Sequence, residues 1–357
     1  MAPLITSRPS LQREALALVA TSALASWLVF GRSQASAAQV DTGPDTVTVT
    51  SGQLTLHGLV WRPAGAGPFP AVLFNHGSYD ARDSISMNEP VVLGRLFARH
   101  GYVFLFLFRQ GIGLSSGHGT ADGELMARAL AAEGTTGRNR VQLRLLEHEE
   151  LDEAAAGLSF LRALPYVDRT RAAVAGHSFG GSLTLLIAAR DTTLRTAVAF
   201  APAAFSWGES PELRARLNAA VDRTAAPVMF IHARNDYSTE SGKALAAEMK
   251  RLGKQSVLEI YPAVGTTARE GHNLIYRNVS AWERDVFRFL DQHTRPRAPR
   301  RQSTTSHVGA SARRLPARLV CVARSLRSTR IRFTASPASR PSTRQIVGPS
   351  AEAIPFG

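Results

Sequence analysis

The sequence predicts an α/β fold built on a mostly parallel, doubly wound sheet. Short apolar segments alternate along the chain with longer segments of helical periodicity, which is the order of strands joined by crossover helices. Residues 102–108 are almost wholly apolar, as expected for a strand that helices cover on both faces of a sheet. After residues 172–176 the pattern changes within a few positions from an apolar strand to a helix.

The first elements begin at residue 45. Residues 45–50 and 54–61 are two strands separated by Ser-Gly, so an antiparallel hairpin opens the domain. A further apolar strand is expected over 68–75. Helical periodicity over 89–100 then leads into the buried strand over 102–108.

A long helix is predicted over residues 140–164, because apolar residues recur along one stripe of it. Glu150, Asp152 and Glu153 lie on this helix and are interpreted as its solvated face. The remaining elements alternate as before. They are strands over 172–176, 197–201, 228–233 and 257–261, and helices over 241–251 and 280–293.

Two segments between these elements are candidates to border a site. Residues 202–227 contain a short predicted helix over 211–221. Residues 117–137 form a second insertion, rich in Gly and Ala, that is expected to border the same site.

The positive charge of the chain belongs to its ends. The formal net charge is +14, and residues 295–357 carry 13 arginines and one acid. Residues 1–37 add a net charge of +2, which leaves residues 38–294, the predicted folded domain, formally neutral. We therefore expect no nucleic-acid partner for the folded body. The composition of residues 295–357 is typical of a disordered tail, with a basic amphipathic helix on an anionic membrane as the alternative.

Residues 1–37 have the three parts of a secretory signal peptide. Two arginines precede an apolar stretch over 15–30, and a small-residue cleavage site ends at Ala37. We therefore expect an exported protein, periplasmic or secreted, with an uncleaved N-terminal anchor as the alternative. The sole cysteine, Cys321, lies in the tail, so no intrachain disulfide is expected.

Ser178 is the candidate nucleophile. It is the centre of Gly176-His177-Ser178-Phe179-Gly180, a G-x-S-x-G motif between a strand and a helix, where a tight turn exposes a serine hydroxyl. Residues 113–117 match the same pattern around Ser115. They follow a polar break and precede no helical pattern, so they are predicted to be a loop.

Asp236 and His272 are the candidate acid and base. A serine hydroxyl becomes nucleophilic when a neutral imidazole removes its proton, and a carboxylate orients that imidazole. Asp236 follows the strand over 228–233, and His272 follows the strand over 257–261. Taken singly, each could close a turn or lie on the surface, but the order Ser, Asp, His after separate strands predicts a catalytic triad. His232 lies within a strand and is interpreted as a core histidine.

Two backbone N–H groups are expected to stabilise the oxyanion. One belongs to Phe179, directly after the nucleophile. The other comes from the turn at Gly77, and its donor is Ser78 or, as the alternative, Tyr79. The sequence contains no metal-binding cluster, phosphate loop or dinucleotide motif, so no cofactor or metal is expected.

Four motifs resemble those of the α/β-hydrolase superfamily, and within it those of the dienelactone hydrolase-like group. They are Asn75-His76-Gly77-Ser78, Gly176-His177-Ser178-Phe179-Gly180-Gly181, Ala233-Arg234-Asn235-Asp236-Tyr237-Ser238 and Gly271-His272. The resemblance spans about residues 45–293 and implies the α/β-hydrolase fold. It also implies that residues 202–227, which lie where relatives place a lid, form a small lid over an open site for a small or short-acyl ester. Founding dienelactone hydrolases use a cysteine nucleophile, so the serine at this position favours a serine esterase.

The sequence therefore predicts a serine hydrolase that cleaves small carboxylic esters or lactones through an acyl-enzyme on Ser178. A perhydrolase, an acyltransferase or a peptidase could use the same triad. A non-enzymatic protein that binds its partner through the basic tail is a further alternative. The sequence predicts no oligomeric state.

Overall fold

A computed structural model describes residues 43–79, 88–294 and 296 of the 357-residue chain. The predicted signal peptide over 1–37, Cys321 and all but one residue of the predicted tail over 295–357 lie outside the described residues. In the described part, no helix is both long enough and apolar enough to cross a membrane.

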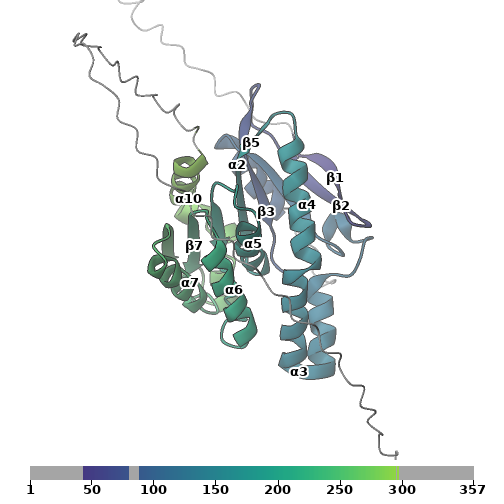
Figure 1. Cartoon of the computed structure of the whole chain (residues 1–357), viewed down its shortest axis with the longest axis vertical. Coiled ribbons are helices and arrows are strands. Elements are labelled where there is room, and N and C mark those ends of the chain that lie inside the picture. Colours follow the sequence, from purple (N-terminus) through teal and green to yellow (C-terminus); the bar gives the residue numbers. More distant parts are fainter. Residues whose placement is uncertain (1–42, 80–87, 295, 297–357) are drawn as a thin grey trace, which may run out of the picture. The chain divides into compact units, whose positions relative to one another are not determined.

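An eight-stranded sheet forms the centre of the fold, in the order β1-β2-β4-β3-β5-β6-β7-β8 (Figure 1). The first two strands form the predicted antiparallel hairpin, and β2 also pairs antiparallel with β4, whereas β3 to β8 are parallel. The strands are β1 (Asp45–Ser51), β2 (Leu54–Trp61), β3 (Phe69–Asn75), β4 (Val103–Phe108), β5 (Val167–His177), β6 (Ala197–Phe200), β7 (Val228–Ala233) and β8 (Ser256–Tyr261). The predicted fold class is confirmed.

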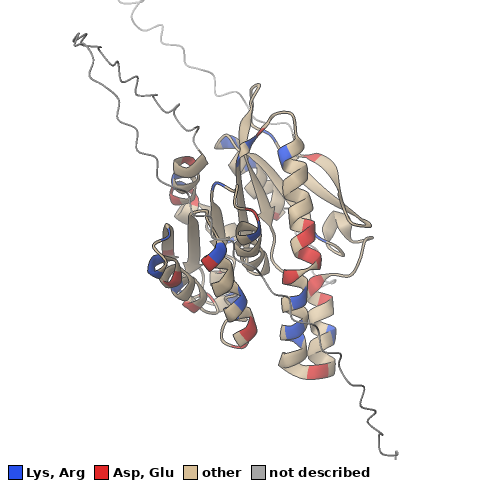
Figure 2. Cartoon of the chain, in the orientation of Figure 1, with Lys and Arg blue, Asp and Glu red and all other residues tan. Residues whose placement is uncertain are grey.

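Helices cover both faces of this sheet. One face packs against α4, α5, α6 and α7 and the other against α2 and α10, each with its own cluster of buried apolar side chains. The helices are α2 (Asn88–Arg99), η1 (Gly113–Ser115), α3 (Asp122–Glu147), α4 (Glu149–Ala163), α5 (Phe179–Arg190), α6 (Pro211–Arg223), α7 (Glu240–Arg251), α8 (Ala268–His272), α9 (Leu274–Arg277) and α10 (Val279–Thr294). Figure 2 shows Lys and Arg positions interspersed with Asp and Glu positions along these helices.

The strand order places a crevice between β3 and β5. The chain passes from β3 to β4 on one side, and then crosses to β5 on the other side of β3. The connections that leave the carboxyl ends of β3 and β5 therefore diverge, and ligands of open α/β sheets bind in the crevice at such a point. Both G-x-S-x-G motifs can now be placed: Ser178 directly follows β5, whereas Ser115 ends η1.

The helix predicted over residues 140–164 is wrong in its extent. The backbone of His148 has φ −125° and ψ −94°, which ends α3 and begins α4. The helical region also begins earlier than predicted, at Asp122. Gly134 divides α3 into two arms with φ 66° and ψ −162°, a conformation that essentially only glycine adopts. Most of the predicted insertion over 117–137 is therefore helical.

The interpretation of the acidic cluster on α4 is also wrong for two of its three members. Glu150 and Glu153 are buried, with 0% and 1% of their surface exposed. Asp152 is exposed and pairs with Arg190 across 2.6 Å. The face of α4 that carries Glu150 is directed at the buried side chain of Arg109 instead of at solvent.

The segment predicted as a small lid has two different parts. Its helix, α6, is a member of the helical layer on the sheet, because Leu213, Leu217 and Val221 are buried in the same core as α5 and α7. Only the turn that precedes α6, around residues 203–206, borders the site. The wall on the opposite side comes from α3, as expected for the region 117–137.

Candidate active site

Ser178 lies in a strained turn between β5 and α5. Its backbone has φ 57° and ψ −117°, which is costly for a residue other than glycine and is typical of sites where function maintains the strain. The flanking glycines make the turn possible. A Cβ atom at Gly176 would lie 2.2 Å from the carbonyl oxygen of Gly180, and a Cβ atom at Gly180 would lie 2.1 Å from that of Asn75.

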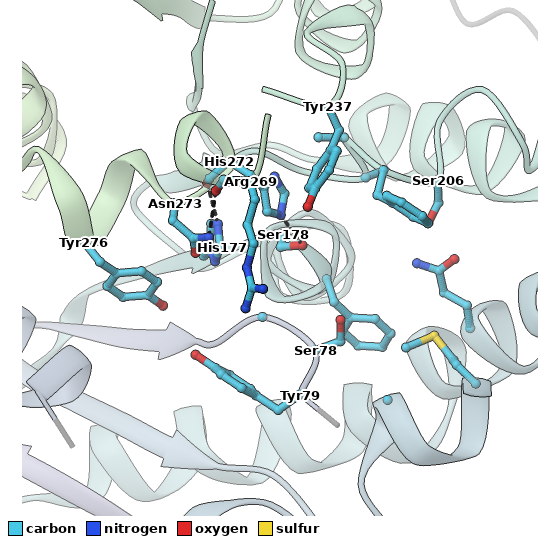
Figure 3. Close-up of a pocket in the computed structure, with 18 of the residues that line it drawn as sticks. Ser78, Tyr79, His177, Ser178, Ser206, Tyr237, Arg269, His272, Asn273 and Tyr276 are labelled. Carbon is cyan, nitrogen blue, oxygen red and sulfur yellow. Dashed lines mark hydrogen bonds between the residues drawn. The ribbon is translucent and has the colours of Figure 1, made fainter. Parts of the chain in front are cut away.

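The structure brings Ser178, His272 and Asp236 into one chain of hydrogen bonds. His272 Nε2 is 2.8 Å from Ser178 Oγ (Figure 3). His272 Nδ1 is 2.7 Å from Asp236 Oδ1. With the proton on Nδ1, the imidazole donates to the carboxylate and accepts from the serine hydroxyl. This is the arrangement that activates a serine nucleophile.

Hydrogen bonds join the loop that carries Asp236 to the segment that leads to His272. Asn235, the neighbour of Asp236, donates from Nδ2 to the carbonyl oxygens of Val264 and Thr267, and its Oδ1 accepts from the Val264 N–H. Thr267 then begins α8 with a capping box, and His272 ends this helix. The position of His272 relative to Asp236 therefore rests on several hydrogen bonds outside the pair itself.

His232 is a second partner of the candidate acid. Its Nδ1 is 2.8 Å from Asp236 Oδ2, and the Tyr237 N–H donates to Asp236 Oδ1 at 2.7 Å. Burial disfavours the charged carboxylate, but the hydrogen bonds from His232 and His272 outweigh it and lower the pKa of Asp236 to about 2. His232 is buried as predicted, but its contact with Asp236 was not predicted.

His177, the residue before Ser178, helps to position the backbone of His272. Its Nε2 donates to the carbonyl oxygen of His272 at 2.8 Å. Burial, with the adjacent charge of His272, lowers the pKa of His177 to about 3. The His177 ring is therefore neutral near pH 7, and it acts on His272 through the backbone.

The second oxyanion donor can be narrowed to one of the two predicted candidates. The Tyr79 N–H donates to Asp122 Oδ1 at 3.0 Å and is therefore occupied. Ser78 lines the cavity, and its N–H has no acceptor among the described residues. Phe179 is the first residue of α5, where the N–H groups have no acceptor within the helix. Ser78 and Phe179 thus remain as the pair of candidate donors.

A cavity of about 820 Å³ opens above Ser178. Part of its wall is apolar and comes from α3 and the turn before α6, namely Met126, Ala127, Leu130 and Phe205. Another part is polar, and Figure 3 shows Tyr79, Tyr276 and Arg269 projecting into it.

Glu89 and Tyr79 form a pair in this cavity that sequence patterns did not indicate. The Tyr79 hydroxyl donates to Glu89 Oε2, and burial raises the pKa of the Glu89 carboxyl. Glu89 comes from the first turn of α2, which directly follows the undescribed residues 80–87. Within the described ranges, no group of three or more His, Cys, Asp or Glu side chains is arranged to hold a metal ion.

Comparison of the sequence with known families and curated proteins identifies two relationships. The model of the dienelactone hydrolase family matches residues 56–293. A polyketide transferase, grgF, from Penicillium sp is 28% identical over 219 residues. The match covers 58% of this chain and about 65% of that protein, so the chain spans just under two thirds of the length of this relative.

Solved structures share the fold at low sequence identity. An acylaminoacyl peptidase from Pyrococcus horikoshii superposes with a TM-score of 0.52 at 17% identity, over 72% of this chain and 43% of the peptidase. A proposed dienelactone hydrolase from Klebsiella pneumoniae subsp. pneumoniae gives a TM-score of 0.50 at 18% identity, over 70% of this chain and 97% of the other. The chain spans less than half the length of the peptidase.

Proposed function

The chain belongs to the dienelactone hydrolase family, and on this basis we propose that it is a serine hydrolase that cleaves small carboxylic esters or lactones. One observation carries the proposal. The imidazole of His272 is within hydrogen-bond distance of both Ser178 Oγ, at 2.8 Å, and Asp236 Oδ1, at 2.7 Å. A hydroxyl in this arrangement can lose its proton as it attacks a carbonyl carbon.

The proposed reaction has two halves. Ser178 Oγ attacks the carbonyl carbon while its proton passes to His272 Nε2, and the N–H groups of Ser78 and Phe179 stabilise the oxyanion that forms. His272 then donates the proton to the leaving oxygen, which departs as an alcohol or as the opened end of a lactone. A water molecule, deprotonated by His272, hydrolyses the acyl-enzyme and regenerates Ser178. Asp236 stays ionised throughout and stabilises the His272 cation.

Acyl transfer is the second candidate, because the curated relative is named as a polyketide transferase. The same acyl-enzyme would then pass its acyl group to an alcohol or another nucleophile instead of water. The peptidase alternative draws on fold similarity alone, since the peptidase structures are at most 20% identical to this chain.

Hydrolysis and acyl transfer can be tested together. The full chain is incubated with p-nitrophenyl esters of graded acyl length, with and without an added alcohol, and separately with N-acylated peptides. The products are identified by mass spectrometry. Free acid as the main product supports hydrolysis, a new ester as the main product supports acyl transfer, and cleavage of N-acylated peptides alone supports a peptidase. The Ser178→Ala variant should lose both turnover and labelling by a fluorophosphonate.

Ser115→Ala is the matched control for the nucleophile. Ser115 occupies the other G-x-S-x-G motif, but its buried hydroxyl donates to the Phe108 carbonyl and accepts from the His57 N–H. We expect Ser115→Ala to keep its fluorophosphonate labelling. Undiminished labelling of Ser178→Ala would refute the proposed nucleophile.

We further propose export of the protein, from the signal-like pattern of residues 1–37. Secretion of a reporter protein fused to this segment tests the proposal, and retention of the reporter in the cytoplasm would contradict it.

A further inference from the structure

Arg109 is a buried arginine behind the candidate oxyanion turn. It directly follows β4, and only 2% of its surface is exposed. Its Nη1 donates to the His76 carbonyl oxygen at 2.8 Å, and its Nη2 donates to the Gly77 carbonyl oxygen at 2.9 Å. One guanidinium group therefore binds two successive carbonyl groups of the turn that carries Ser78.

These contacts fix the direction of the Ser78 N–H. The Gly77 carbonyl and the Ser78 N–H belong to one trans peptide group, in which the two bonds point in opposite directions. The carbonyl is directed at Arg109, so the N–H is directed away from Arg109. The turn lies against the nucleophile, because a Cβ atom built on Gly77 would be 3.5 Å from Ser178 Cβ.

His76 reinforces the same peptide group. Its Nε2 accepts from the backbone N–H of Arg109 at 3.2 Å, so its proton is on Nδ1, which donates to the Gly77 carbonyl at 2.7 Å. Burial, and then the charge of Arg109, hold the pKa of His76 well below its ordinary value, so the ring stays neutral. The Gly77 carbonyl thus accepts from two side chains on the side away from the pocket.

Arg109 also lies beside two carboxyl groups, those of Asp122 and Glu150. Arg109 Nη2 donates to Asp122 Oδ2 at 3.0 Å, and Asp122 Oδ1 accepts the Tyr79 N–H. The Arg109–Asp122 pair therefore holds the backbone on both sides of Ser78. Glu150 Oε2 also lies 2.5 Å from Arg109 Nε.

Arg109 also contacts the other candidate donor. Its guanidinium lies over the ring of Phe179, 5.2 Å from the ring centroid. Arg109 therefore contacts both candidate donors. It donates to the Gly77 carbonyl of the Ser78 peptide group, and it packs against the Phe179 ring.

We propose that Arg109, assisted by His76, is a positioning residue that orients the Ser78 N–H toward the oxyanion. This inference rests on the proposed function, because it assigns a task to the oxyanion turn of that reaction. A purely structural role would change the stability of the fold, whereas a positioning role changes how well the site binds the transition state relative to the substrate.

Arg109→Lys is the main test variant, because lysine keeps the charge beside Asp122 and Glu150 but cannot bind both carbonyls with a planar fork. We expect kcat for a p-nitrophenyl ester to fall by about 10- to 100-fold, since loss of an oxyanion donor costs about 10²- to 10³-fold. KM should change by less than about threefold. The affinity for a trifluoromethyl ketone, whose adduct with Ser178 carries an oxyanion, should fall by the same factor as kcat/KM.

Arg162→Lys is the matched control, because Arg162 also pairs with a carboxylate, Asp191, but has no contact with the oxyanion turn. Its kcat and inhibitor affinity should equal those of the unmodified chain. A folded Arg109→Lys variant with unchanged kcat and unchanged inhibitor affinity would overturn the inference, while loss of activity in Ser178→Ala would still support the proposed function. If the unmodified chain has no Ser178-dependent activity, the proposed function fails and the inference with it.

If Arg109→Lys does not fold, His76 provides the test. His76→Asn keeps an N–H donor near the position of Nδ1, whereas His76→Leu removes it. We expect His76→Leu to lower kcat and ketone affinity about tenfold, and His76→Asn to restore most of both. Equal values for the two variants would overturn the inference.

Discussion

His232 donates its Nδ1 proton to Asp236 Oδ2, the carboxylate oxygen that His272 does not use. The Asp236 carboxylate is therefore held between two imidazole rings, one on β7 and one at the end of α8. A carboxylate held in this way cannot rotate without losing a hydrogen bond at each oxygen. The orientation of His272 therefore depends on His232 as well as on Asp236.

Removal of the His232 donor should weaken catalysis without abolishing it. In His232→Leu the Asp236 carboxylate loses one of its donors, so its pKa should rise and its hold on His272 should loosen. We expect kcat/KM to fall about tenfold, in line with the loss of one hydrogen bond to a charged group, about 1.5–3 kcal/mol. His232→Asn, which retains a donor near Nδ1, should recover most of the activity. Equal rates for His232→Leu and the unmodified chain would contradict this role.

Asp236 should contribute to stability in a pH-dependent way. Its pKa of about 2 in the folded protein lies below the ordinary value of 3.8. This contribution is therefore present above pH 4 and lost as the pH falls from about 4 to about 2. The shift corresponds to about 2 kcal/mol. Urea denaturation of the unmodified chain and of Asp236→Asn should show a difference in unfolding free energy that shrinks by about this amount on acidification. A constant difference would count against the charged pair.

Glu153 should have the opposite pH dependence. Burial raises its pKa to about 7 from the ordinary value of 4.5, so its protonated form favours the folded state. The associated stability is present below about pH 4.5 and lost as the pH rises to about 7. Glu153→Gln has no charge to lose, so it should gain about 3 kcal/mol relative to the unmodified chain between pH 4.5 and 8. The exposed Glu212→Gln serves as the control, and an equal pH dependence in both variants would refute the prediction.

Leu130 should influence the preference for acyl length. Its side chain lines the cavity and is 46% exposed, so a substitution there leaves the core intact. Leu130→Asp should raise KM for hexanoyl esters about fivefold, because loss of contact with one methylene group costs about 0.8 kcal/mol and a chain of this length loses more than one. KM for acetyl esters should change little. Leu114→Asp, at a 41% exposed leucine that does not line the cavity, should have no such effect.

Sequence order was enough to predict that Ser178, Asp236 and His272 lie together, since each follows its own strand and parallel strands end at one edge of the sheet. It could not predict that His232 binds Asp236, because a histidine in an apolar strand has the same pattern whether it binds a carboxylate or only fills space. The same holds for Glu150 and Glu153. Helical periodicity identifies a polar face but does not show whether water or a buried arginine lies opposite.

The predicted and observed helices also differ at His148 and at Gly134, and both differences have local causes. No proline or glycine marks the break at His148, so the pattern continues through it. Gly134 does offer a signal for the turn within α3, but glycine alone does not distinguish a turn between two helical arms from an irregular insertion. The choice between Ser78 and Tyr79 depended on one contact, the Tyr79 N–H with Asp122, which joins residues 43 positions apart.

The two-armed helix α3 borders the cavity but carries none of Ser178, Asp236 and His272. Its first arm supplies Met126, Ala127 and Leu130 to the cavity, while residues 130–136 around the turn are exposed and make no part of the sheet. The length or composition of residues 130–136 can therefore change without disturbing Ser178, Asp236 or His272. Such changes can accumulate by evolutionary drift or be introduced by loop grafting. Libraries confined to α3 therefore offer a route to new acyl preferences on an unchanged catalytic centre.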